Sequence, residues 1–181
     1  MVAASFSTIL YPSLPNSPIV EDKWKANPMS KVFDTLHHVC IVVRNADKTA
    51  AYYQNLGIGP WQDYPPLSAY AELEVPNLQG FKGLVFKFVN LANFQLQLCQ
   101  PGDGDSPQKR FLDSHGEGVF HLGFDVPSCD LGESHASVAH VPVLMRGRRG
   151  DRSGFTFFDT AEKAGVVLEI RSSLPMAKAK P

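Results

Sequence analysis

Four residues of the chain carry side chains of the kinds that bind divalent metal ions, and they lie at matched places in two similar segments. His38 and Gln97 belong to the first half of the chain, and His121 and Glu169 belong to the second. In each half a histidine lies on an apolar stretch near the start, and an oxygen-bearing side chain lies on another near the end. Two imidazoles, one amide and one carboxylate suit a divalent cation that keeps open coordination positions. The spacing therefore predicts one metal site built by both halves.

The same residues also fit a simpler interpretation. A single histidine on an apolar strand is more often a core residue than a ligand, but two at matched positions favour metal binding. Glu169, within the apolar stretch VVLEI, would be buried without a partner if no cation lay beside it. Gln97 is the weakest donor of the four, and Gln95 on the same strand face is a competitor for its place.

Composition excludes several functional classes. With 181 residues, 44% hydrophobic and 19% charged, the chain is typical of one soluble globular domain that two modules could form. Its net charge of −1 offers no basic field for nucleic acid, and no apolar run approaches the roughly 20 residues that span a bilayer. The three cysteines form no C-x-x-C pair, so we expect buried thiols in a reducing, cytoplasmic setting, and no signal peptide is predicted.

Hydrophobic periodicity predicts the order β-α-β-β-β twice, which is an internal repeat. Asn45 is expected to cap the first helix, and Ser106, followed by Pro107, a short helix in the connector. We predict turns over 77–80 and 160–165. In the first half the predicted strands are 37–43, 70–75, 82–89 and 94–99, with a helix over 47–54; in the second they are 119–126, 141–146, 155–158 and 166–171, with a helix over 128–139.

This pattern predicts an α+β fold in which two tandem βαβββ modules form a curved, cup-shaped mixed sheet around a metal site. Side chains alternate between the faces of a strand, and each candidate ligand falls on the face with the smaller or more polar residues. The aliphatic faces are expected to pack under the helices. The expected divisions are an irregular extension over 1–31, module 1 over 32–103, a helical connector over 104–116, module 2 over 117–172 and a tail over 173–181.

Several segments in fixed order resemble the vicinal oxygen chelate superfamily, which includes glyoxalase I, bleomycin-resistance proteins and ring-cleaving dioxygenases. They are HHVCIVV (37–43), NADKTAAYYQNLGIGPW (45–61), FQLQLCQPGDGDSPQKRFLDSHGEGVFHLGFDV (94–126) and GVVLEI (165–170). Within the superfamily the chain is most similar to the methylmalonyl-CoA epimerase branch, and the resemblance covers roughly residues 35–172.

The resemblance implies a divalent-metal enzyme in which two modules surround one ion, with His38, Gln97, His121 and Glu169 as ligands. It implies isomerase, epimerase or lyase chemistry on a small carbonyl compound through an enolate-like oxyanion, with Zn, Co, Ni or Mn as the metal and Glu169 as the catalytic base. One position departs from the pattern: Leu78, in the stretch NLQG, stands where the epimerases carry a second catalytic Glu. This favours a one-base reaction over stereochemical inversion.

Other residues are candidates for contact with substrate. Arg146 and Arg149 belong to the stretch MRGRRGDR and suit an anionic group of the substrate. Trp61 and Tyr64 are expected at the mouth of the cup. Spacing alone suggests a proton donor among Tyr70, Glu72, Glu74 and Lys82.

Two alternatives use the same site differently. In one, His38, His121 and Glu169 form the 2-His-1-carboxylate triad of an Fe(II) dioxygenase, with Gln97 as a hydrogen-bonding neighbour. In the other, the chain is a metal-free small-molecule-binding protein like the bleomycin-resistance group, which leaves Glu169 unexplained. Modules of this family often pair across chains, so we expect a homodimer.

Overall fold

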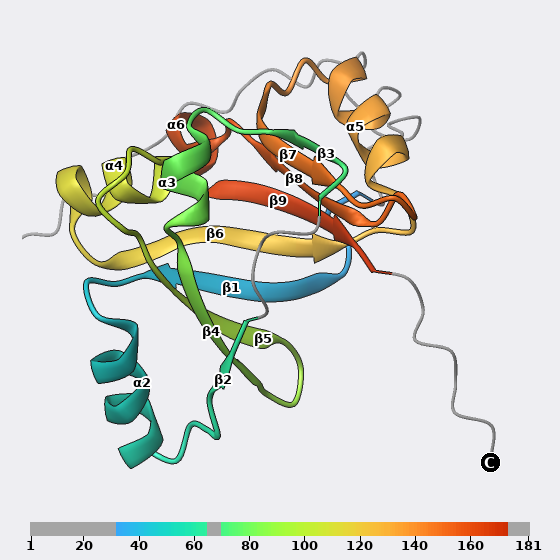
Figure 1. Ribbon diagram of the computed structural model, residues 1–181. Coiled ribbons are helices and arrows are strands. Elements are labelled where there is room, and N and C mark those ends of the chain that lie inside the picture. The colour runs from blue at the N-terminus through green and yellow to red at the C-terminus, as the bar shows by residue number, and fades with distance from the viewer. Residues whose placement is uncertain (1–31, 65–69, 174–181) are drawn as a thin grey trace, which may run out of the picture.

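The computed structural model describes residues 32–64 and 70–173, and the strands in these ranges form one mixed sheet (Figure 1). The order across this nine-stranded sheet is β2-β4-β5-β1-β6-β9-β8-β7-β3. The strands are β1 (Leu36–Val42), β2 (Gln62–Asp63), β3 (Glu72–Glu74), β4 (Val85–Asn90), β5 (Gln95–Gln100), β6 (Gly118–Asp125), β7 (Val143–Arg148), β8 (Gly154–Phe158) and β9 (Val167–Ser172). The helices are α2 (Ala46–Asn55), α3 (Leu78–Lys82), α4 (Pro107–His115), α5 (Cys129–Val138) and α6 (Ala161–Ala164).

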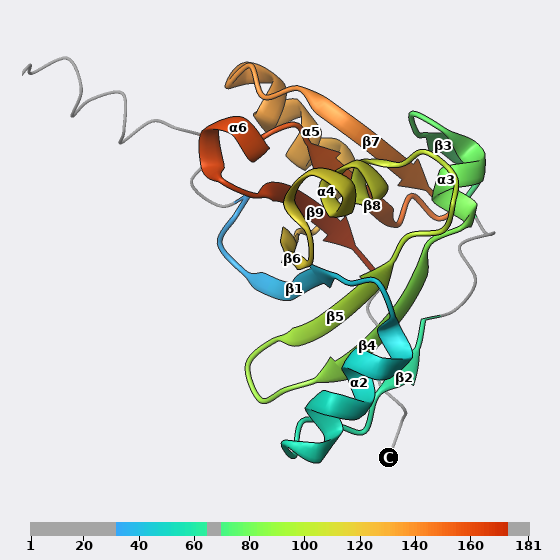
Figure 2. The ribbon, with the colours of Figure 1, turned by 90° about the vertical axis from the view of Figure 1, so that its left-hand side faces the viewer.

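The two halves of the sheet share one topology. Outward from the centre, the first half runs β1, β5, β4, β2 and the second runs β6, β9, β8, β7. β1 is parallel to β5, β6 is parallel to β9, and the two halves join where β1 pairs with β6 antiparallel. The halves curve away from this central pair (Figure 2). The predicted α+β fold of two repeated units is thereby confirmed.

Helices α2 and α4 begin where the sequence predicted. Asn45 accepts a hydrogen bond from the Lys48 amide at the start of α2, and Ser106 accepts one from the Lys109 amide at the start of α4. Each cap satisfies a backbone donor that the first turn leaves free. The described helices include none long and apolar enough to cross a bilayer.

The aliphatic faces pack under the helices on the outside of the sheet. Under α2, Val43 and Leu98 are buried against Ala46 and Ala50. Under α5, Phe158 and Ile170 are buried in a second cluster that includes Cys129 and Ala136 of that helix. The opposite face of the sheet is thus free to form the inside of the cup. All three cysteines are free and buried, as predicted.

The segment predicted as the second strand of module 1 lies elsewhere. Within it, β3 pairs antiparallel with β7 at the far edge of the other half, and the short β2 takes the expected place beside β4. The charges of the edge strands favour this pairing, because Glu72 contacts Arg152 at 2.6 Å and Glu74 contacts Arg146 at 2.5 Å. The predicted strand over 70–75 is thus present as β3, and it pairs with the second half of the sheet.

Two predicted turns contain helical residues. The stretch at 77–80 enters α3, because the Asn77 side chain accepts a hydrogen bond from the Gly80 amide and caps the helix. The helix passes so close to the connector that a Cβ on Gly80 would lie 1.8 Å from the Asp105 carbonyl oxygen. The predicted strand over 82–89 therefore begins only at Val85, and the turn at 160–165 contains the single-turn α6.

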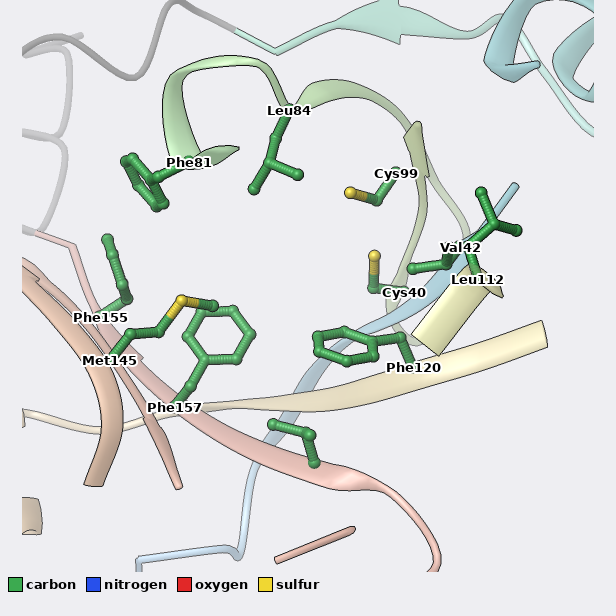
Figure 3. Packing of buried hydrophobic residues seen from close by; sticks show 11 residues of the cluster. Cys40, Val42, Phe81, Leu84, Cys99, Leu112, Phe120, Met145, Phe155 and Phe157 are labelled. Carbon is green, nitrogen blue, oxygen red and sulfur yellow. The ribbon is translucent and has the colours of Figure 1, made fainter. Parts of the chain in front are cut away.

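The inside of the cup is lined by a third apolar cluster drawn from both halves. Figure 3 shows Phe81 and Leu84, from the segment around α3, across from Met145 and Phe157 on β7 and β8. Because β3 and α3 carry first-half residues over to the second half, the two halves enclose this interior jointly.

Candidate metal centre

Three buried side chains meet on the inner face of the sheet. His38 Nε2 lies 2.8 Å from His121 Nε2, and each of these nitrogens lies 3.0 Å from Glu169 Oε2. The side chains are 3%, 1% and 8% exposed, respectively. In the part of the chain that the structure describes, they are the one group of histidine, cysteine and acidic side chains whose ligand atoms converge within 4.8 Å of one another.

The pairing of the three central strands places these atoms together. His38 on β1 lies opposite Gly123 on β6, and Gly123 lies opposite Glu169 on β9. His121 is two residues before Gly123, on the same face of β6. Gly123 itself is required, because a Cβ there would lie 2.0 Å from His38 Cε1 and 2.5 Å from both ring nitrogens. The His38 ring therefore crosses β6 above Gly123 to reach the carboxylate.

The electrostatics of the cluster favour a positive charge. Burial alone would raise the pKa of Glu169, but the adjacent His38 and His121 imidazoles outweigh it and hold that pKa well below its ordinary value. Burial lowers the pKa of His38, so its ring is neutral and offers a lone pair. Burial would also lower the pKa of His121, but Cys40 and Glu169 raise it to about 10. An ionised carboxylate with two imidazoles is thus a place where a cation is stabilised.

The donor set fits a divalent metal. Imidazole and carboxylate ligands bind such ions at about 2.0–2.2 Å, and ligand atoms at right angles around one ion then lie roughly 3 Å apart, as the three donor atoms do here. His121 Nδ1 is buried and has no hydrogen-bond partner among the described residues; it faces the Cys40 thiol, whose own pKa burial raises.

Gln97 lies next to the three-residue cluster and is 5% exposed. Its Nε2 donates to Gln95 Oε1 at 2.7 Å, and Gln95 Nε2 donates to Asn90 Oδ1 at 2.9 Å. These two hydrogen bonds fix the orientation of the Gln97 carboxamide. They leave its carbonyl oxygen free to bind a metal ion. Gln97 also lines the same cavity as the cluster. Its place as a fourth ligand remains a prediction.

The cluster opens into a cavity whose empty space, counted together with the open solvent at its mouth, is about 660 Å³. One wall is apolar and aromatic, with the Phe81 and Phe155 rings stacked at 5.8 Å. Two cationic side chains, Arg149 and Arg171, face the same space. The cavity therefore combines a metal-type ligand set with room for an organic molecule and positive charge for an anionic group of it.

The residues predicted to bind substrate fall into two groups. Tyr64 and Arg149 line the cavity, and the Arg149 guanidinium lies 4.9 Å from the centre of the Tyr70 ring. Arg146 and Trp61 are not among the described residues that line it. Arg146 pairs with Glu74 and Glu133, and the Trp61 indole N–H donates to the Ile58 carbonyl. Both make contacts within the fold, and their role in binding substrate stays a prediction.

Among the proposed proton donors only Tyr70 lines the cavity. Burial raises the pKa of its hydroxyl to about 12, so the group stays protonated across the physiological range. Glu72 and Glu74 are held by arginines at the edge of the sheet. Leu78 is 46% exposed on α3 and is not among the described residues that line the cavity.

Two residues of the cavity were missed by sequence reasoning. Gln108 is 1% exposed, and it lies at the second position of α4, where a polar residue is ordinarily solvated. Arg171 is half-buried two residues after Glu169, contacts His37, and lies 3.5 Å from Asp125. The alternation of β9 placed Arg171 on the ligand face, so that signal was present in the sequence; none existed for Gln108.

The chain is similar to known proteins over much of its length. Residues 37–158 match the Glyoxalase/Bleomycin resistance protein/Dioxygenase superfamily. Mitochondrial methylmalonyl-CoA epimerase from Bos taurus is 24% identical over 141 residues, covering 76% of this chain and 74% of that protein. The enzyme of the same name from Homo sapiens is 34% identical over 86 residues, 48% of this chain and 42% of that protein.

Among solved structures, the fold is similar to Streptomyces coelicolor methylmalonyl-CoA epimerase, of which a single-residue variant was solved in complex with 2-nitronate-propionyl-CoA. The TM-score is 0.59 at 23% identity, over 79% of this chain and 99% of that chain. At this identity the likeness establishes the fold, and the chemistry must be argued from the residues of the site.

Proposed function

The chain belongs to the glyoxalase/bleomycin resistance protein/dioxygenase superfamily, and from its site we propose that it is a divalent-metal-dependent isomerase or lyase acting on a small carbonyl compound. The reaction we propose is removal of a proton from the carbon next to that carbonyl, with the enolate-like oxyanion stabilised by the metal. The observation that carries the proposal is the buried convergence of His38, His121 and Glu169 within one cavity.

The proposed ligands are these three side chains and the Gln97 amide oxygen. Metal binding would displace the proton that His121 holds at neutral pH, because a ligating imidazole must be neutral. Two neutral imidazoles, one neutral amide and one carboxylate then leave a divalent ion with a net charge of about +1. When bound, the ion would supply Lewis-acid stabilisation of an oxyanion beside it. Zn, Co, Ni and Mn all suit this donor set.

Glu169 is proposed as the base. Its Oε2 contacts both imidazoles, and its Oε1 accepts no hydrogen bond from any described residue, which leaves that oxygen to receive a substrate proton. The lowered pKa keeps the carboxylate ionised. General-base catalysis requires a protonatable atom within hydrogen-bond reach of the acidic carbon, and Glu169 lines the cavity in which that carbon would lie.

Proton return is proposed to involve the same face of the substrate. The resemblance places Leu78 where the epimerases carry a second acid, and a leucine cannot donate a proton. Tyr70 supplies a protonated hydroxyl in the cavity and is the candidate to donate a hydrogen bond to the reacting group. We therefore expect exchange or isomerisation in preference to inversion.

The test is deuterium exchange. Metal-reconstituted protein is incubated in D2O with methylmalonyl-CoA, the substrate named by its relatives, and with propionyl-CoA and pyruvate, and label at the carbon next to the carbonyl is followed by mass spectrometry. We expect incorporation into at least one compound, and a fall of about 10²–10⁴-fold in Glu169→Gln. Chiral analysis of the methylmalonyl-CoA then separates exchange with retention from inversion.

The matched control is Glu117→Gln, which alters an exposed carboxylate that accepts from the Arg44 amide. It should exchange like the parent protein. Full turnover in Glu169→Gln would exclude Glu169 as the base. Absence of exchange with all three compounds in protein shown to hold one equivalent of metal would exclude enolate chemistry on thioesters and 2-keto acids.

A dioxygenase is the second candidate, because His38, His121 and Glu169 are themselves a 2-His-1-carboxylate set. Metal analysis of the purified protein separates the candidates: iron with oxygen uptake on catechols or hydroxyphenylpyruvates supports the dioxygenase. Zinc, cobalt, nickel or manganese supports the isomerase. Protein that binds none of these metals would instead be a small-molecule-binding module.

A further inference from the structure

Gln108 is a buried polar side chain with nothing to bind in the described structure. It is 1% exposed, and neither its Nε2 nor its Oε1 has a hydrogen-bond partner among the described residues. It shares the buried face of α4 with Leu112, one turn later. Burying an unpaired carboxamide is unfavourable, so an apolar residue would be the stabilising choice for this position.

The side chain lines the cavity of the metal centre. α4 packs against the two central strands, β1 and β6, and lies at the end of the sheet where β6 begins (Figure 1). Gln108 belongs to this side of the cavity. Arg171 and Ser172 enter from the opposite end, where the parallel strand β9 finishes. His121 and Glu169 lie between these two ends. A molecule bound at the centre can therefore reach Gln108 with one end and the arginines with the other.

The chemistry of the carboxamide limits what it can recognise. Gln108 offers two N–H donors and one carbonyl acceptor, and the cavity also contains the apolar Phe81, Leu84 and Phe157. A ligand carboxylate would accept from Nε2 but leave Oε1 facing another acceptor. A hydroxyl or an amide satisfies both atoms, since each both donates and accepts.

We propose that Gln108 is a specificity-determining residue that binds a neutral hydrogen-bonding group of the ligand, a hydroxyl or an amide, at the α4 end of the cavity. The inference rests on the proposed function only in taking the cavity as the ligand site. It does not depend on which reaction follows.

The first arm of the test is stability. Gln108→Met keeps a similar shape and removes the unpaired polar atoms, so its urea midpoint should equal or exceed that of the parent protein. The matched control is Gln100→Met, because Gln100 Oε1 accepts a hydrogen bond from the Ala46 amide at 2.9 Å at the start of α2. That variant should have a lower midpoint. A Gln108→Met midpoint as low as the control would show a structural role and overturn the proposal.

The second arm is binding to cobalt-loaded protein, measured by calorimetry without turnover. Hydroxypyruvate is compared with pyruvate, and N,S-diacetylcysteamine with S-ethyl thioacetate; the first pair differs by a hydroxyl and the second by an amide. We expect about tenfold tighter binding of the richer member in at least one pair, the value of one good hydrogen bond. The pair that discriminates identifies the source of the group.

Gln108→Met should remove that preference and bind both members of the pair equally. Equal binding of both pairs by the parent protein, or an unchanged preference in Gln108→Met, would overturn the proposal. Because this arm needs no proton exchange, a protein that discriminates but does not exchange would refute the proposed function alone.

Discussion

Gly123 offers the sharpest test of how the site is built. Its absent side chain lets the His38 ring cross β6 to Glu169, and a Cβ there would lie 2.0 Å from His38 Cε1. Carbon atoms in contact lie about 3.5–4.0 Å apart, so Gly123→Ala must displace the ring by roughly 1.5 Å. Metal–ligand distances tolerate about 0.2 Å. The substitution therefore removes His38 from the ligand set without changing any ligand.

The expected result is a loss of metal affinity larger than the roughly 10–100-fold that follows when only an outer partner of a ligand is lost. The assay is competition for Co²⁺ or Zn²⁺ against a chromophoric chelator, together with the Co²⁺ absorption spectrum. The control is Gly118→Ala on the same strand, where the new Cβ would meet only the Phe111 ring, with its nearest atom, Cζ, at 3.7 Å. Gly118→Ala should bind metal like the parent protein.

A double-mutant cycle separates the proposed cause from general damage. His38→Ala should lose as much affinity as Gly123→Ala, and the pair together should lose no more than either alone. Unchanged metal affinity in Gly123→Ala would refute the reasoning. So would additive losses in the double variant, because Gly123 would then act by some route other than the His38 ring.

Three further outcomes are expected. Glu133→Gln should lower the free energy of unfolding by about 1–3 kcal/mol in urea denaturation, because it removes one of the two carboxylate partners of the buried Arg148 guanidinium and leaves Asp130 as the other; a change as small as that of a surface variant would contradict this. Tyr70→Phe should slow exchange without moving its pH profile, since the Tyr70 pKa of about 12 keeps the hydroxyl protonated; a shifted profile between neutral pH and pH 9 would count against it. Arg148 and Arg152 hold the pKa of Asp130 below its ordinary 3.8, so this carboxylate stabilises the fold above that value and the contribution is lost as pH falls through the lower folded-state pKa. Acid unfolding of Asp130→Asn should show a weaker pH dependence there, and an identical acid limb would exclude the contribution.

The repeat in the sequence was sufficient to predict the fold class and the convergence of His38, His121 and Glu169. Alternation fixes which side chains share a face, and matched positions in two modules fix which strands carry them. The clusters under α2 and α5 confirm that the aliphatic faces lie outside.

The pairing of the 70–75 segment could not be predicted in the same way. The alternation within a strand shows which residues share a face, but it does not identify the strand that pairs with it. β3 pairs with β7, and the ion pair between Glu74 and Arg146 joins residues that lie far apart in the sequence. The same pairing sets Arg146 against Glu74, and the contact of Arg146 with substrate stays a prediction. Gln108 escaped notice because burial of a polar helix residue depends on what the fold lays over it.

The geometry of the site depends most on the pairing of β1 with β6, the seam between the two halves. Register shifts lie on both sides of the stretch from His38 to Cys40, between Leu36 and His38 and between Cys40 and Ile41. Between these shifts the pairing is regular, and it sets His38 opposite Gly123 and Cys40 opposite His121. A slip of one residue would turn the His38 ring to the aliphatic face under α2. Irregular pairing beside a site is a common means of aiming one side chain, and here it lets the first half contribute its histidine to a carboxylate that belongs to the second.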